Sequence, residues 1–172
     1  MTDNNKKRIL VVDDEADVRN FLKAALLEAG FEVITAEHGN LALEEVKKQL
    51  PDLISLDLVM PKKSGAKLYH ELSKKKEWSK IPIIIVTGHA RDDLGKADLK
   101  ELTMSGPGVY LEKPVKPNNY IAAVKNILKM DITEEEEQTA EKVYLQNDLK
   151  NIIDDADSDT LKKIKEILSK KK

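Results

Sequence analysis

The chain has 172 residues, enough for one well-cored domain and an appendage but too few for two full domains. It contains no cysteine, which excludes disulfide frameworks and thiolate sites, and its formal net charge of −2 gives no sign of a polyanionic partner. No apolar run approaches membrane-spanning length, and the apolar run near the N-terminus is too short for the core of a signal peptide. These features predict a cytoplasmic protein without a membrane partner.

Five apolar runs rich in β-branched residues recur at wide spacing, and such runs are typical of strands buried on both faces of a parallel sheet. They cover residues 8–12, 32–36, 52–56, 81–86 and 108–111. Helical patterns cover residues 15–30, 40–50, 66–78 and 117–130, with a weaker pattern over 90–105. Gly30 ends the first helix, Asn40 is a candidate N-cap of the second, and Pro117 suits the first turn of the last. This alternation predicts an α/β fold with a doubly wound, five-stranded parallel sheet.

The pattern changes after Met130, where the strand signals end. Thr133 and Glu136 have the spacing of a capping box at the start of a helix. Two apolar stripes at helical spacing follow, separated by "DDADSD": Leu145, Leu149, Ile152 and Ala156, then Leu161, Ile164, Ile167 and Leu168. Because apolar stripes on so short a segment are expected to be buried, we predict a helical extension that packs against another surface. The predicted division is an α/β domain over 1–130 and an extension over 131–172, as a helical hairpin or one long helix with a weak break.

Polar side chains follow the predicted strands, at the sheet edge where doubly wound folds bind ligands. They are Asp13, Asp14, Asp57, Thr87 and Lys113. Clustered carboxylates are hard oxygen ligands that suit Mg²⁺, and a cation, a lysine and a hydroxyl together stabilise charge on a transferring phosphoryl group. An aspartate in such a place can act as nucleophile and carry an acyl phosphate. The sequence therefore predicts a magnesium-dependent phosphoryl site at the carboxyl ends of the strands.

Four segments resemble the receiver domains of response regulators in two-component signalling, in the order and spacing of that family. They are "ILVVDDE", "DLISLDLVMPKKSG", "IPIIIVTGHA" and "VYLEKP". The resemblance covers about residues 7–130 and implies the flavodoxin-like strand order 2-1-3-4-5. It implies that Asp57 is the phosphoacceptor and that Asp14, Asp57 and the backbone carbonyl of Val59 hold Mg²⁺. Asp13 matches the partner acid, which usually acts through a metal-bound water.

The resemblance also assigns the residues that respond to phosphorylation. Thr87 and Lys113 match the side chains that bind the phosphoryl oxygens, and Tyr110 matches the aromatic switch whose rotamer follows Thr87. Ser64 departs from the family pattern, because an acid is common there, whereas Gly65 is retained. The implied protein catalyses only its own phosphorylation and dephosphorylation and is not a metabolic enzyme. A sensor histidine kinase or phosphotransfer protein would donate the phosphoryl group, and a downstream protein would read the switched surface.

Two other functions are weaker matches to the sequence. A haloacid-dehalogenase-type phosphatase has its nucleophile after the first strand in an Asp-x-Asp pattern, which "VVDDE" lacks. A DNA-binding transcription regulator would need residues 131–172 to bind DNA, but they contain twelve acids and eight lysines, so a nucleic-acid partner is not favoured. For the extension, packing on the last helix of the domain or docking a partner is favoured over a dimeric coiled coil, because the heptad spacing is imperfect. Dimerisation stays an open alternative.

Overall fold

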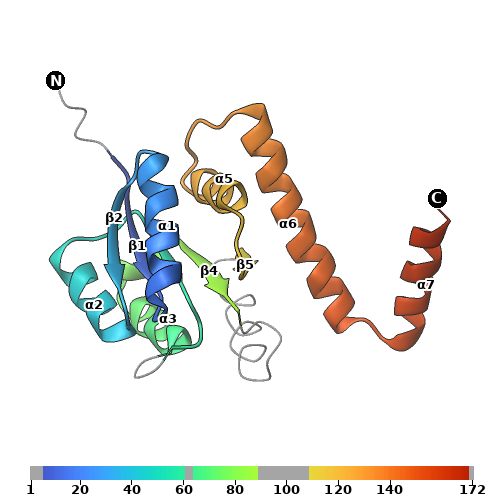
Figure 1. The fold of residues 1–172 in the computed structure, drawn as a ribbon. Helices are drawn as coiled ribbons and strands as arrows, with labels where there is room; N and C mark the ends of the chain where they lie inside the picture. Colours follow the sequence, from blue (N-terminus) through green and yellow to red (C-terminus); the bar gives the residue numbers. More distant parts are fainter. Residues whose placement is uncertain (1–5, 61–63, 89–108, 171–172) are drawn as a thin grey trace.

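A computed structural model describes residues 6–60, 64–88 and 109–170. Five strands form one parallel sheet in the order β2-β1-β3-β4-β5, which confirms the predicted fold (Figure 1). Their bounds are β1 Arg8–Val12, β2 Glu32–Ala36, β3 Leu53–Leu56, β4 Ile83–Thr87 and β5 Tyr110–Glu112. In the register of the sheet Val12 lies beside both Ala36 and Leu56, so the residues after β1 and β3 emerge next to each other.

The helices cover both faces of the sheet. They are α1 Ala16–Glu28, α2 Gly39–Lys48, α3 Gly65–Ser73 and α5 Pro117–Ile127, and a 3₁₀ turn covers Trp78–Lys80. As predicted, α1 ends before Gly30, whose φ of 91° lies in the left-handed region that glycine adopts readily. The N-cap predicted for α2 is wrong, because His38 fills that position and its Nδ1 accepts a bond from the Leu41 amide at 3.3 Å. The helix predicted over 90–105 lies outside the described residues.

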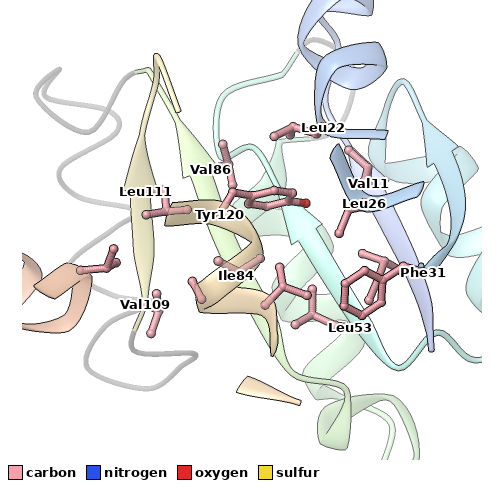
Figure 2. Packing of buried hydrophobic residues seen from close by; sticks show 14 residues of the cluster. Val11, Leu22, Leu26, Phe31, Leu53, Ile84, Val86, Val109, Leu111 and Tyr120 are labelled. Carbon is pink, nitrogen blue, oxygen red and sulfur yellow. The ribbon is translucent and has the colours of Figure 1, made fainter. Parts of the chain in front are cut away.

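Two apolar cores lie on opposite faces of the sheet. One joins α1 and α5 to the sheet, and Figure 2 shows Tyr120 of α5 lying among Val86, Leu111 and neighbouring side chains. The other joins α2, α3 and the single tryptophan, Trp78, to the opposite face. Burial of the sheet on both faces explains why its strands are almost continuously apolar. It also leaves the carboxyl edge as the place where polar groups gather.

The extension consists of two helices, α6 Glu134–Asp155 and α7 Ser158–Ser169, so a break falls at the predicted place. Thr133 and Glu136 form the predicted capping box, with backbone-to-side-chain bonds of 3.2 and 2.9 Å. Helix α6 packs against α5 and contributes Val143 to the core of the α/β domain. Helix α7 turns back from the end of α6 in Figure 1 and has no buried residue.

The predicted burial of the two apolar stripes of the extension is wrong, because α7 has no buried residue and the leucines of the first stripe face solvent. Leu145, Leu149 and Ile152 are 55–56% exposed. The buried face of α6 is formed instead by Ala140, Val143 and Asn147. Within the described part of the chain, no helix has both the length and the apolar character needed to cross a bilayer.

Candidate functional site

Three carboxylates meet at the carboxyl edge of the sheet, as the strand-end pattern predicts. Asp13 and Asp14 follow β1, and Asp57 follows β3. One oxygen of each lies within 4.8 Å of the others. Asp13 and Asp57 are buried, at 1% and 2% exposure, whereas Asp14 is exposed to solvent. Backbone bonds continue the sheet to both buried acids, because the Asp57 amide donates to Val12 at 2.9 Å and the Asp13 amide donates to Ala36 at 3.1 Å.

Lys113 supplies the positive charge of this cluster. Its Nζ lies 2.8 Å from Asp13 Oδ2, 2.8 Å from Glu15 Oε1 and 3.1 Å from Asp57 Oδ2. Burial alone would lower the pKa of Lys113, but hydrogen bonds to Asp13 and Glu15 and the charge of Asp57 outweigh it, so this pKa is raised. Burial also raises the pKa of Asp13, against the opposing effect of the lysine. The ammonium group therefore compensates like charges that would otherwise repel.

Two residues contribute to the site without having been predicted there. Glu15, the third acid of the "DDE" run, pairs with Lys113, although its side chain is 59% exposed. Arg19 donates from Nη1 to the carbonyls of Asp13 and Asp14 at 2.8 and 3.0 Å and so fixes the loop between β1 and α1. The acidic run was a visible signal for Glu15. Nothing in the local pattern identified Arg19, because its role depends on the orientation of the first turns of α1, which point this side chain back at the Asp13 and Asp14 carbonyls.

The loop after Asp57 is fixed by a close backbone approach. The Gly65 amide donates to Leu58 at 2.9 Å, and a Cβ at Gly65 would lie only 2.1 Å from the carbonyl oxygen of Asp57. Ser64 caps α3 through its hydroxyl, which accepts from the Lys67 amide at 3.3 Å. Within this turn the Val59 amide donates to Asp57 Oδ1 at 3.3 Å. A glycine is therefore required where α3 meets the strand end that carries Asp57.

The donor set fits a small divalent cation. Carboxylate oxygens converge within a few ångströms, two of them on buried residues, and one exposed acid leaves a side open to water. Mg²⁺ favours few protein ligands, all oxygen, together with several waters. A single lysine shared among Asp13, Glu15 and Asp57 leaves the cluster with excess negative charge that a cation would compensate. Asp14, Asp57 and Asp13 are the side chains that would hold such an ion.

Comparison with known proteins identifies the family. The family model described as "Response regulator receiver domain" matches residues 9–125. The chain belongs to the response regulator receiver family. It is thus a two-component signalling protein, as the four sequence segments indicated.

Relatives and solved structures agree with this assignment. The receiver is 37% identical over 129 residues to the probable transcriptional regulator ycf27 of Pyropia yezoensis, which covers 74% of this chain and 49% of that relative. It is 36% identical over 123 residues to the phosphate regulon transcriptional regulatory protein PhoB of Pseudomonas aeruginosa, covering 72% and 52%. The response regulator TrrA of Thermotoga maritima, solved in complex with Mg²⁺-BeF, is 36% identical, with a TM-score of 0.58 and coverage of 70% and 98%. The chain spans about half the length of the curated relatives it matches.

The residues predicted to respond to phosphorylation lie on the neighbouring strands β4 and β5 of the receiver. Thr87 ends β4 and is fully buried, and its carbonyl accepts from the Lys113 amide at 3.1 Å. Tyr110 pairs with Ile85 in the sheet and is 4% exposed, packed beside Leu58. Burial raises the pKa of the Tyr110 phenol. The Lys113–Pro114 peptide bond is cis.

Proposed function

We propose that this receiver is a phosphorylation-controlled switch whose acceptor is Asp57. The observation that carries the proposal is the pairing of one buried carboxylate, Asp57, with one nearly buried ammonium, Lys113, at 3.1 Å beside two further acids. A strand-end aspartate with a cation and a fixed lysine is the arrangement that phosphoryl transfer requires. The phosphoryl donor is a phosphohistidine of a sensor histidine kinase or phosphotransfer protein.

In the proposed step a carboxylate oxygen of Asp57 attacks phosphorus as the bond from phosphorus to the donor imidazole nitrogen breaks. Lys113 and the Thr87 hydroxyl bind the phosphoryl oxygens, and the imidazole leaves with its electron pair. Mg²⁺, when bound, supplies charge compensation for the carboxylates and the phosphoryl group. Asp14, Asp57 and the Val59 carbonyl are proposed as its protein ligands, with Asp13 acting through a bound water. Attack by water then releases inorganic phosphate and restores the Asp57 carboxylate, so the only phosphorylation and dephosphorylation that the protein catalyses are its own.

The proposed output is a change in the surface around β5. Binding of a phosphoryl oxygen by Thr87 alters the space beside Tyr110, whose ring then changes rotamer. A downstream protein would bind one of the two resulting conformers. We place the receiver module in residues 1–130 and the helical extension in 131–172, in a protein that works in the cytoplasm.

A DNA-binding output is a second candidate, because two of the relatives described above are named as transcriptional regulators. The acidic balance of residues 131–172 argues against their binding DNA by themselves. A salt-dependent mobility shift of duplex DNA by the full chain would support this candidate. A shift that is lost when the extension is removed would place DNA binding there.

The test of the proposed function is chemical labelling of the full chain. With acetyl phosphate and Mg²⁺, intact-mass measurement should show one phosphoryl adduct that hydroxylamine removes. Asp57→Asn should abolish it, and Asp17→Asn, an exposed aspartate on α1, should leave it unchanged. Chelation of Mg²⁺ should suppress labelling. Equal labelling of the Asp57→Asn variant and the wild type would refute the assignment.

A further inference from the structure

Helix α6 buries a polar residue where an apolar one would be expected. Asn147 is 8% exposed, whereas Leu145 and Leu149 on either side of it are more than half exposed. A buried amide lowers stability unless its polar atoms are paired, and exposed leucines contribute little. Stability alone would favour the reverse arrangement. The buried asparagine therefore points to a specific contact.

That contact is with the backbone of β5. Asn147 Oδ1 accepts from the Tyr110 amide at 2.9 Å, and Asn147 Nδ2 donates to the Val143 carbonyl of its own helix at 2.8 Å. The bond to Val143 orients the side-chain amide so that its oxygen faces the strand. Among the described residues β5 is the last strand of the sheet, so its Tyr110 amide faces away from β4 and binds Asn147 in place of a neighbouring strand.

A second residue of α6 holds the same strand. Lys150, three positions after Asn147 and therefore on the same helix face, forms an ion pair with Glu112 at 2.5 Å. Its Nζ also lies 5.6 Å from the centre of the Tyr110 ring. Glu112 directly precedes Lys113 along the chain. Helix α6 thus holds both ends of the short strand that carries Tyr110 and leads into Lys113.

We propose that Asn147 and Lys150 are positioning residues for Lys113 and Tyr110, and that docking of α6 opposes phosphorylation of Asp57. This inference rests on the proposed function. In the docked arrangement Lys113 Nζ contacts Asp57 Oδ2 directly, at 3.1 Å, so a phosphoryl group on that oxygen would displace this contact. Glu112, the residue before Lys113, is paired with Lys150, so a shift of Lys113 towards the phosphoryl oxygens would disturb that pair. Movement of β5 or of the Tyr110 ring therefore disrupts the contacts that hold α6.

The coupling is reciprocal for binding, which gives two linked measurements. Binding of a phosphoryl mimic should loosen α6, and loosening α6 should raise the affinity for the mimic by the same factor. The first measurement is hydrogen exchange of α6 amides in the full chain, with and without beryllium fluoride and Mg²⁺. We expect exchange in α6 to accelerate by roughly 5-fold or more when the mimic binds, because typical coupling factors are about 5 to 150. Exchange in α2, on the opposite face of the sheet, should stay unchanged and serves as the internal control.

The second measurement compares variants of α6 by their rate of labelling with acetyl phosphate and their affinity for beryllium fluoride. Asn147→Ala leaves the Tyr110 amide without its acceptor and should raise both quantities. Gln146→Ala, its exposed neighbour on the same helix, is the matched control and should raise neither. Lys150→Glu should act like Asn147→Ala, whereas Lys142→Glu, which introduces the same charge change at an exposed position of α6, should have no effect.

Charge exchange separates positioning from general loss of stability. The double variant Glu112→Lys with Lys150→Glu restores an ion pair of opposite sense, so it should return the labelling rate towards that of the wild type. A merely structural effect would accumulate over the two substitutions instead. If the mimic binds but leaves α6 exchange unchanged or slower, or if Asn147→Ala labels no faster than Gln146→Ala, this inference is overturned alone. If the wild type acquires no label at Asp57, the proposed function fails and this inference fails with it.

Discussion

Replacement of Lys113 by methionine tests whether one ammonium group holds the acidic cluster together. Methionine keeps most of the side-chain volume and removes the charge. Asp13 and Asp57, each 2% exposed at the side chain, would then share the site without a cation at 2.8 and 3.1 Å. Glu15 would also lose its pairing with Lys113, but its side chain is largely solvated. We expect a marked loss of stability when no divalent ion is present.

The magnitude follows from the burial of the partners. Removing one member of a buried ion pair typically costs about 3–5 kcal/mol, whereas a solvent-exposed pair contributes about 0–1 kcal/mol. The Lys113 side chain is 13% exposed and the site opens to water at Asp14, so the lower end of the buried range applies. We therefore expect the free energy of unfolding to fall by about 3 kcal/mol at neutral pH in the presence of a chelator.

Urea unfolding followed by tryptophan fluorescence measures this change directly, since Trp78 is the single tryptophan and is 9% exposed. Lys67→Met, on the exposed side of α3, is the matched control and should change stability by less than about 0.5 kcal/mol. Saturating Mg²⁺ should recover part of the loss in the Lys113→Met variant, because a bound cation replaces the missing charge. A loss no greater than that of Lys67→Met would refute the view that Lys113 compensates buried carboxylates.

Three further predictions concern the surroundings of the site and the extension. Gly65→Ala should lower the free energy of unfolding by about 1–3 kcal/mol in urea titration, because the added Cβ would clash with the Asp57 carbonyl. Gly88→Ala is the control and should change this free energy little, since its Cβ would lie 3.8 Å from the Lys113 side chain. Arg19→Met should cost about 0.5–1.5 kcal/mol and weaken Mg²⁺ binding in calorimetry, because two bonds to the acidic loop are lost. The hydrogen bond from Lys125 lowers the pKa of Glu136, so this contact stabilises the fold above the ordinary pKa of a glutamate and is lost as the pH falls through the lowered value. The difference in urea midpoint between wild type and Glu136→Gln should be full at neutral pH and vanish in acid, below the lowered pKa of Glu136; a difference that persists in strong acid would contradict the assigned contact.

The sheet and its polar edge could be predicted because their causes are local. Continuous apolar runs indicate buried parallel strands, and parallel strands place their carboxyl ends at one edge. Asp13, Asp57 and Lys113 could therefore be grouped from their positions after strands, without any knowledge of distances. Glu15 was visible in the same acidic run, yet its pairing with Lys113 depends on the side-chain directions set by the first turn of α1.

The extension shows where periodicity is insufficient. The stripe of Leu145, Leu149 and Ile152 has helical spacing, and the segment is a helix, but this stripe faces solvent. Spacing shows which residues share a face and does not show which face meets the domain. That choice depends on the surface offered by α5 and β5, where Asn147 binds the Tyr110 amide and Val143 joins the core. No sequence pattern identified Asn147, because its role is to accept a hydrogen bond from the Tyr110 amide, thirty-seven positions away in the chain.

The position of β5 at the edge of the described sheet has a consequence for the protein when its helical extension is removed. A three-residue border strand would ordinarily offer its unpaired backbone to any extended chain nearby, which is a common route to aggregation. Here α6 covers that edge strand. Removal of α6 would expose both the Tyr110 amide and apolar surface of the core that α6 shares with α1 and α5. A protein truncated after residue 130 should therefore aggregate at concentrations at which the full chain stays in solution.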